Sequence, residues 1–148
     1  SLELTQTIRT ASRDGSLLEV LDRTVTSMGA RRLSQWLASP LISKEQIELR
    51  LQAVEEFTND DRLRNSLRAM LSDIYDIERL TARVATGRCS PRDLKQMGRS
   101  LAQLPKIKAL LEERYAARLT QLQQRLDLLP SLRDHLDAAL EEDCPLQP

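Results

Sequence analysis

Residues that could carry enzymatic chemistry are sparse in this 148-residue sequence. His135 is the only imidazole, and it lies between Asp134 and Leu136 on what we expect to be a polar helix surface. Nucleophilic catalysis requires a serine or cysteine held next to such a base. We therefore interpret His135 as an ordinary surface residue and set aside the protease and esterase classes.

The residues that could bind a metal ion or a phosphate also lack the necessary spacing. The two cysteines, Cys89 and Cys144, form no CxxC pair and have no histidine nearby, so no zinc site is expected. Adjacent acidic residues point in different directions on a helix, which is poor geometry for sharing a metal ion or a proton. The four glycines match neither GxGxxG nor GxxxxGK, the phosphate-binding loops. We expect no catalytic, cofactor or metal site in this chain.

Charge and hydropathy narrow the possible partners. Twenty-two basic residues balance twenty-two acidic ones, so the chain as a whole does not attract phosphate backbones or anionic membranes. Apolar runs are far shorter than the roughly 20 residues that span a bilayer, so no membrane role is expected. Residues 1–10 lack the basic and apolar regions of a secretion signal. We expect a cytoplasmic protein with reduced thiols, although the sequence also allows a Cys89–Cys144 disulfide.

Some charged residues are spaced for pairing. Asp76 precedes Arg79 by three residues and Arg83 by seven, which predicts an ion-pair ladder along one helix face.

The densest basic cluster consists of Arg31 and Arg32, with Arg23 upstream. It could contact a phosphate or an acidic partner, or simply form the charged flank of a helix.

The elements that must position these residues are predicted to be helices. Leu, Ala, Arg, Gln and Glu dominate, whereas the sequence has only four glycines and four aromatic residues. Apolar residues recur at helical spacing along most of the chain. We predict one all-α domain over residues 1–148, a multi-helix bundle of about seven helices. The alternation at residues 2–6 allows at most a short N-terminal strand.

Local residues mark where the helices begin and end. Helix starts are predicted by capping residues, and breaks by proline or glycine. The spacing from Leu63 to Val84 predicts one long or once-broken helix, and the stripe that begins at Ile107 is predicted to continue to Tyr115. The predicted starts lie at Ser16, Thr26 or Ser27, Ser43, residues 59–61 and Ser90, and the predicted breaks at Pro40, Gly87, Pro105 and Pro130.

Two longer patterns are more specific. Residues 21–41 read LDRTVTSMGARRLSQWLASPL, and residues 76–83 read DIERLTAR, followed by SPRDL at 90–94. In this order and at this distance they resemble motifs of the MutS family of DNA mismatch repair proteins. The segment from Ile47 to Phe57 matches a further family pattern, and the resemblance weakens after Tyr115.

The resemblance implies that the chain is the first part of the MutS core, or lever, domain. The clamp, mismatch-binding and ATPase domains would then lie outside it. A MutS protein binds mismatched duplex DNA as a homodimer, and ATP and Mg²⁺ are implied for the full-length protein only. This segment would couple DNA binding to the ATPase through rigid helices and contact the other MutS domains.

We expect a group of residues to hold structural or interdomain junctions rather than to catalyse. Charge reversal at Arg79 is expected to lower stability more than DNA affinity. The group comprises Arg23, Arg31, Arg32, Trp36, Asp76, Arg79, Arg83 and Arg92.

Other functions remain as alternatives. A self-contained helical module that binds another protein would be a folded monomer with one open apolar groove. A piece of a larger core would instead expose apolar surface and self-associate. A domain that binds DNA directly would show salt-dependent duplex affinity, which the zero net charge disfavours. An enzyme is the weakest alternative.

Overall fold

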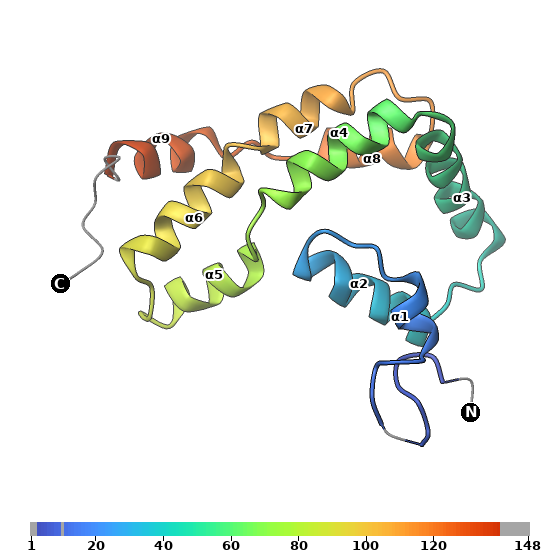
Figure 1. Cartoon of the computed structure of the whole chain (residues 1–148). Coiled ribbons are helices and arrows are strands. Elements are labelled where there is room, and N and C mark those ends of the chain that lie inside the picture. Colours follow the sequence, from blue (N-terminus) through green and yellow to red (C-terminus); the bar gives the residue numbers. More distant parts are fainter. Residues whose placement is uncertain (1–2, 10, 140–148) are drawn as a thin grey trace. The chain divides into compact units, whose positions relative to one another are not determined.

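The computed structural model describes residues 3–9 and 11–139, and this part of the chain forms nine helices and no strand (Figure 1). Seven helices have nine residues or more and two are shorter, which confirms an all-α fold of about seven helices. The helices are α1 (Leu17–Leu21), α2 (Ser27–Ala38), α3 (Lys44–Asn59), α4 (Asp61–Ser72), α5 (Ile77–Ala85), α6 (Pro91–Leu101), α7 (Leu104–Leu110), α8 (Ala117–Arg125) and α9 (Pro130–Ala139).

The chain divides into two compact units, residues 1–48 and residues 49–148, which are treated separately below as unit 1 and unit 2. A single domain over residues 1–148 stays a prediction. No helix in the described ranges is long and apolar enough to cross a membrane.

Unit 1 is held by capped helix starts and one close approach. The Thr26 hydroxyl accepts the N–H of Gly29 at 3.0 Å, as predicted for the start of α2. A Cβ at Gly29 would lie 2.9 Å from that same hydroxyl oxygen, so only glycine fits without displacing the cap. Near the N-terminus, the N–H groups of Leu17 and Leu18 donate to backbone carbonyls of residues 3 and 4. Residues 3–6 therefore meet the start of α1 instead of forming a strand, and Leu2 lies outside the described residues.

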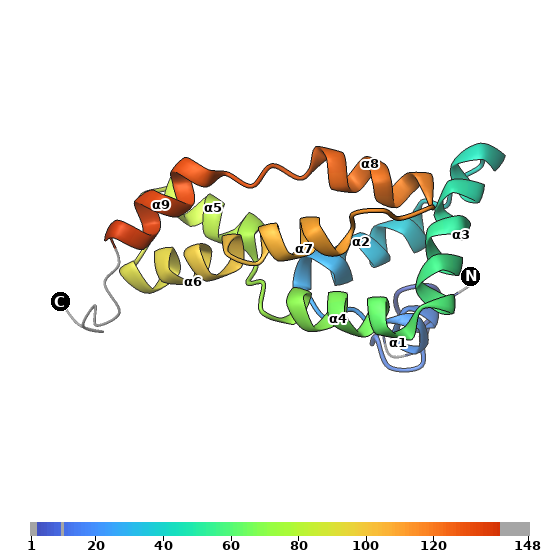
Figure 2. The same ribbon diagram turned by 90° about the horizontal axis from the view of Figure 1, so that it is seen from above.

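In unit 2, α6 packs against both α5 and α9 (Figures 1 and 2). Gly98 lies where α6 meets α9, and a Cβ there would make an ordinary van der Waals contact with the Cβ of Leu136 at 3.7 Å. The buried side chains of this first core are Leu80, Met97, Leu101 and Leu136.

A second core joins α3 to α8, and α4 lies against α7. The buried members of this second core are small or apolar, and Phe57 packs against them. They are Ala53, Ala116 and Leu119.

Two of the helical segments predicted from the sequence are interrupted in the structure. The predicted long helix is broken once, between Ser72 and Ile77, so the second form of that prediction is confirmed. The continuation of the stripe to Tyr115 was wrong: α7 ends at Leu110, and Tyr115 is 68% exposed. Glu113 adopts a left-handed backbone with φ of 58°, which turns the chain toward α8.

Candidate functional site

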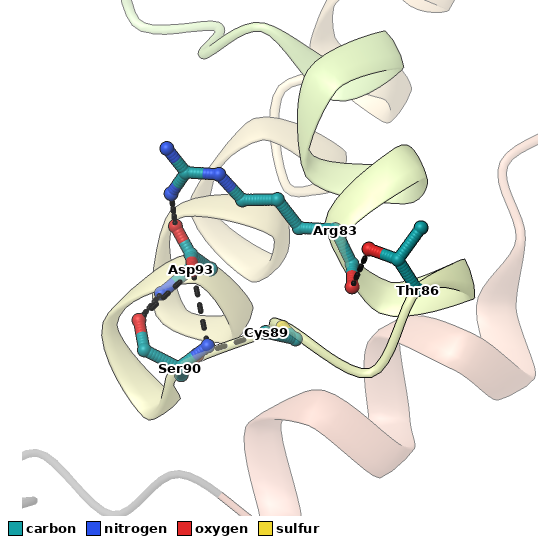
Figure 3. Close-up of polar contacts among 5 residues, drawn as sticks. All are labelled: Arg83, Thr86, Cys89, Ser90 and Asp93. Carbon is teal, nitrogen blue, oxygen red and sulfur yellow. Dashed lines mark hydrogen bonds and ion pairs between the residues drawn. The ribbon is translucent and has the colours of Figure 1, made fainter.

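The start of α6 carries a capping box built from Ser90 and Asp93 (Figure 3). The N–H of Asp93 donates to the Ser90 hydroxyl oxygen at 3.2 Å. In return, the N–H and hydroxyl of Ser90 donate to Asp93 Oδ2 at 3.0 and 2.9 Å. These reciprocal bonds satisfy two otherwise free donors at the helix start and fix the Asp93 carboxylate in place.

Arg83 connects this capping box to the preceding helix. Its guanidinium, on α5, donates to Asp93 Oδ1 at 2.6 Å. Asp93 is 6% exposed, and its other oxygen is occupied by Ser90. The N–H and hydroxyl of Ser90, followed by the Arg83 cation, hold the pKa of Asp93 below its ordinary value. We call this group of Arg83, Ser90 and Asp93 the α5–α6 clasp.

A second clasp joins α3 to the start of α8. The Glu56 carboxylate is 3% exposed, and its Oε2 accepts the N–H of Ala116 at 2.9 Å. The Arg114 guanidinium lies 4.0 Å from Glu56 and 3.9 Å from Asp60. Asp60 also caps α4 by accepting the N–H of Leu63. We call Glu56, Arg114 and Ala116 the α3–α8 clasp. In it, the buried Glu56 carboxylate makes one strong hydrogen bond and one longer ion pair.

In unit 1, Asp22 organises the loop that precedes α2. Its Oδ1 accepts the hydroxyl and N–H of Thr24 at 2.6 and 2.9 Å, and its Oδ2 pairs with Arg13. The Thr24 donors, assisted by Arg13, lower the pKa of Asp22 to about 2.

The four candidate residues of unit 2 have different surroundings. Asp76 caps α5 by accepting the N–H of Arg79 at 3.2 Å. Arg83 pairs with Asp93 in the next helix, a partner that the spacing did not indicate, and the expected ladder stays a prediction. Arg79 and Arg92 are exposed. The structure thus connects Arg83 on α5 to the start of α6.

The candidates of unit 1 lie on or just before α2. Arg23, Arg31 and Arg32 are exposed, and Arg23 donates to the backbone oxygen of Asp22 at 3.4 Å. Trp36 is 41% exposed, and α2 has no buried residue.

Sequence reasoning missed the α3–α8 clasp. Glu56 follows another glutamate in the sequence and gave no sign of burial, but only Glu55 of the two is exposed. Glu56 follows Ala53 by three residues and so shares its face of α3, but only the structure shows that this face is buried. No local pattern links it to Ala116, sixty residues later.

The described side chains form no group of three or more His, Cys, Asp or Glu residues able to hold a metal ion. His135 is exposed, with Nδ1 2.6 Å from the backbone oxygen of Ser131. Cys89 is free, and Cys144 lies outside the described residues. The arrangement of clasps and caps fixes helices to one another.

Comparison with known proteins identifies a matching family. The family model described as MutS domain III matches residues 1–148. The DNA mismatch repair protein MutS of Rhodopirellula baltica is 53% identical over 146 residues. The proteins of the same name from Bacillus thuringiensis (strain Al Hakam) and Bacillus cereus (strain 03BB102) are each 48% identical over 149 residues. These matches cover 99% of this chain but only 16% of each relative.

Proposed function

The chain belongs to the MutS domain III family, and from that premise we propose that it is a mechanical lever that couples DNA binding to ATP hydrolysis. The match to domain III along the whole chain is the observation that carries the proposal. ATP, Mg²⁺ and mismatched duplex DNA would be bound by other domains of a cytoplasmic MutS homodimer. This segment would contact those domains and transmit their changes of state.

The helix clasps support a mechanical role. A lever must resist relative sliding of its helices, and the two clasps of unit 2 join helices through buried carboxylates. Charge-assisted hydrogen bonds of this kind are short and directional, so they hold orientation as well as distance. Coupling between distant sites requires such an element, whose state both sites can bias.

A domain exchange tests the proposal. The matched 146 residues of the R. baltica MutS protein would be replaced by this chain. We expect the hybrid to hydrolyse ATP at different rates with mismatched and fully paired duplex, as an intact coupling element requires. A hybrid that binds DNA and hydrolyses ATP, but shows no dependence of one on the other, would contradict the coupling role.

A clasp variant of the same hybrid tests whether the coupling depends on the α3–α8 clasp. Glu56→Ala should reduce the effect of mismatched DNA on ATP hydrolysis while basal hydrolysis remains. Glu55→Ala, an exposed neighbour on the same helix, is the matched control and should leave the effect intact.

A protein interaction module is the second candidate, favoured by one observation. Leu51 and Val54 lie three residues apart on α3 and are 60% and 58% exposed. An amphipathic partner helix could cover such a face.

A further inference from the structure

Unit 2 contains two apolar cores that have no buried member in common among the described residues. The first core joins α5, α6 and α9, and the second joins α3 and α8. Both views show these two groups of helices at opposite ends of the unit (Figures 1 and 2). Leu63 on α4 and Ile107 and Leu111 at α7 are also buried and belong to neither core. Two cores that share no buried side chain can move relative to each other at lower cost than one continuous core.

Three chain segments cross between the two ends. They are residues 73–76 between α4 and α5, residues 102–103 between α6 and α7, and residues 126–129 between α8 and α9. We call these segments the waist. Leu129 has a left-handed φ of 45°, so the third crossing is irregular backbone. Leu104, at the start of α7, packs against the first core.

One buried side chain fastens the first crossing. Ser100, on α6, is 0% exposed. Its hydroxyl oxygen accepts the N–H of Tyr75 at 2.9 Å, and its proton goes to the carbonyl of Gln96 at 2.8 Å. This bond joins residues 25 apart and fixes the α4–α5 crossing to the last turn of α6.

A cavity of about 480 Å³ lies at the same place. Residues 72–75 line one side, and Arg99, Ala102 and Gln103 line the other. The cavity is open to solvent, because most of the residues that line it are exposed, so the two crossings do not close over each other there. The cavity gives the crossings room to approach or separate.

We propose that unit 2 bends at the waist and that the Ser100 hydroxyl is the latch that holds it in the observed geometry. Breaking the Ser100 to Tyr75 bond frees the α4–α5 crossing while each core remains packed. The proposal that unit 2 bends rests only on the two cores, the three crossings and the Ser100 to Tyr75 bond. Its use as the flexible point of a lever rests on the function proposed above.

The test measures the distance between the two ends in the 148-residue chain. Spin labels would be attached at Gln124→Cys on α8 and Asp137→Cys on α9, both exposed, after replacing Cys89 and Cys144 by serine. Ser100→Ala should broaden the distance distribution, and the Tyr75 amide should exchange about tenfold faster with solvent. In Ser100→Ala, the amides near Leu80 in the first core and near Leu119 in the second core should keep the same ratio of exchange rates as in the parent chain.

Two further variants complete the test. Ser72→Ala also borders the cavity, but its hydroxyl bonds only within α4, to Ala69 at 2.7 Å, so it should leave the distribution unchanged. Ala102→Phe adds an exposed ring at the cavity and should narrow the distribution even if Ser100→Ala does not fold.

The proposal is overturned if the distribution of a folded Ser100→Ala chain matches that of Ser72→Ala. If Ser100→Ala does not fold, an unchanged width in Ala102→Phe overturns it. If the waist bends in the isolated chain but the hybrid MutS protein shows no coupling, the lever function is rejected and the proposed bending at the waist is retained.

Discussion

Glu56 on α3 accepts the backbone N–H of Ala116 at 2.9 Å, although the two residues are sixty positions apart and both are buried. The carboxylate thus serves the residue that precedes α8, a helix with no side-chain cap of its own. A buried acceptor with one strong donor and a longer contact to Arg114 is sensitive to the loss of either partner.

Replacing Glu56 by alanine should destabilise the chain strongly. The substitution leaves the Ala116 N–H buried without an acceptor, which costs about 2 to 3 kcal/mol of unfolding free energy. Urea unfolding followed by circular dichroism measures the change. Glu55→Ala, on the exposed side of the same helix, should stay within about 0.5 kcal/mol of the parent. Equal losses in both variants would show that the hydrogen bond to Ala116 adds nothing.

Much of the fold was readable from local sequence, because helix starts depend on neighbouring residues. The caps at Ser16, Thr26 and Ser90 lie where their residue types indicated, and the cap Asp60 lies within the predicted start at residues 59–61. The family was readable as well, since its motifs are contiguous.

The clasps were not readable, because they pair residues whose distance in space depends on how helices pack. Ser90 was recognised as a helix start, but the pairing of Asp93 with Arg83 depends on the turn between α5 and α6. The stripe to Tyr115 failed for a related reason, since the left-handed residue Glu113 gives no strong sequence signal.

Charge reversal should now discriminate Arg83 from Arg79. Arg83→Glu would place a second carboxylate against the buried Asp93 and should lower Tm by roughly 5 °C. Arg79 is exposed at the third position of α5, where a glutamate can accept the N–H of the cap residue Asp76. Arg79→Glu should therefore leave Tm nearly unchanged. The loss of stability that the sequence led us to expect from charge reversal at Arg79 is now expected at Arg83. A larger loss in Arg79→Glu, measured by thermal denaturation, would contradict this assignment.

The Asp22 carboxyl should titrate in strong acid. Its pKa is lowered to about 2 from an ordinary 3.8, chiefly by the hydroxyl and N–H of Thr24. Because the folded-state value is the lower one, Asp22 stabilises the fold above pH 3.8, and this contribution is lost as pH falls toward 2.

Carboxyl carbon NMR of the folded chain measures this titration directly. Thr24→Val removes the hydroxyl donor at similar volume and should raise the Asp22 midpoint toward its ordinary value. Thr58→Val, whose hydroxyl donates to the Val54 carbonyl on α3, is the matched control and should not shift it. A midpoint near 3.8 in the unmodified chain would refute the hydrogen-bond network around Asp22.

The exposed apolar face of α3 should make the isolated chain self-associate. Leu51 and Val54 expose 60% and 58% of their surface on one side of the helix, and water contact with such a patch is unfavourable. Sedimentation velocity should therefore show a sedimentation coefficient that rises with protein concentration. The double variant Leu51→Lys with Val54→Lys should remain monomeric, whereas Gln52→Lys, an exposed polar neighbour, should behave like the parent. A chain that stays monomeric at every concentration would instead favour a self-contained interaction module, because a core piece needs its apolar faces covered.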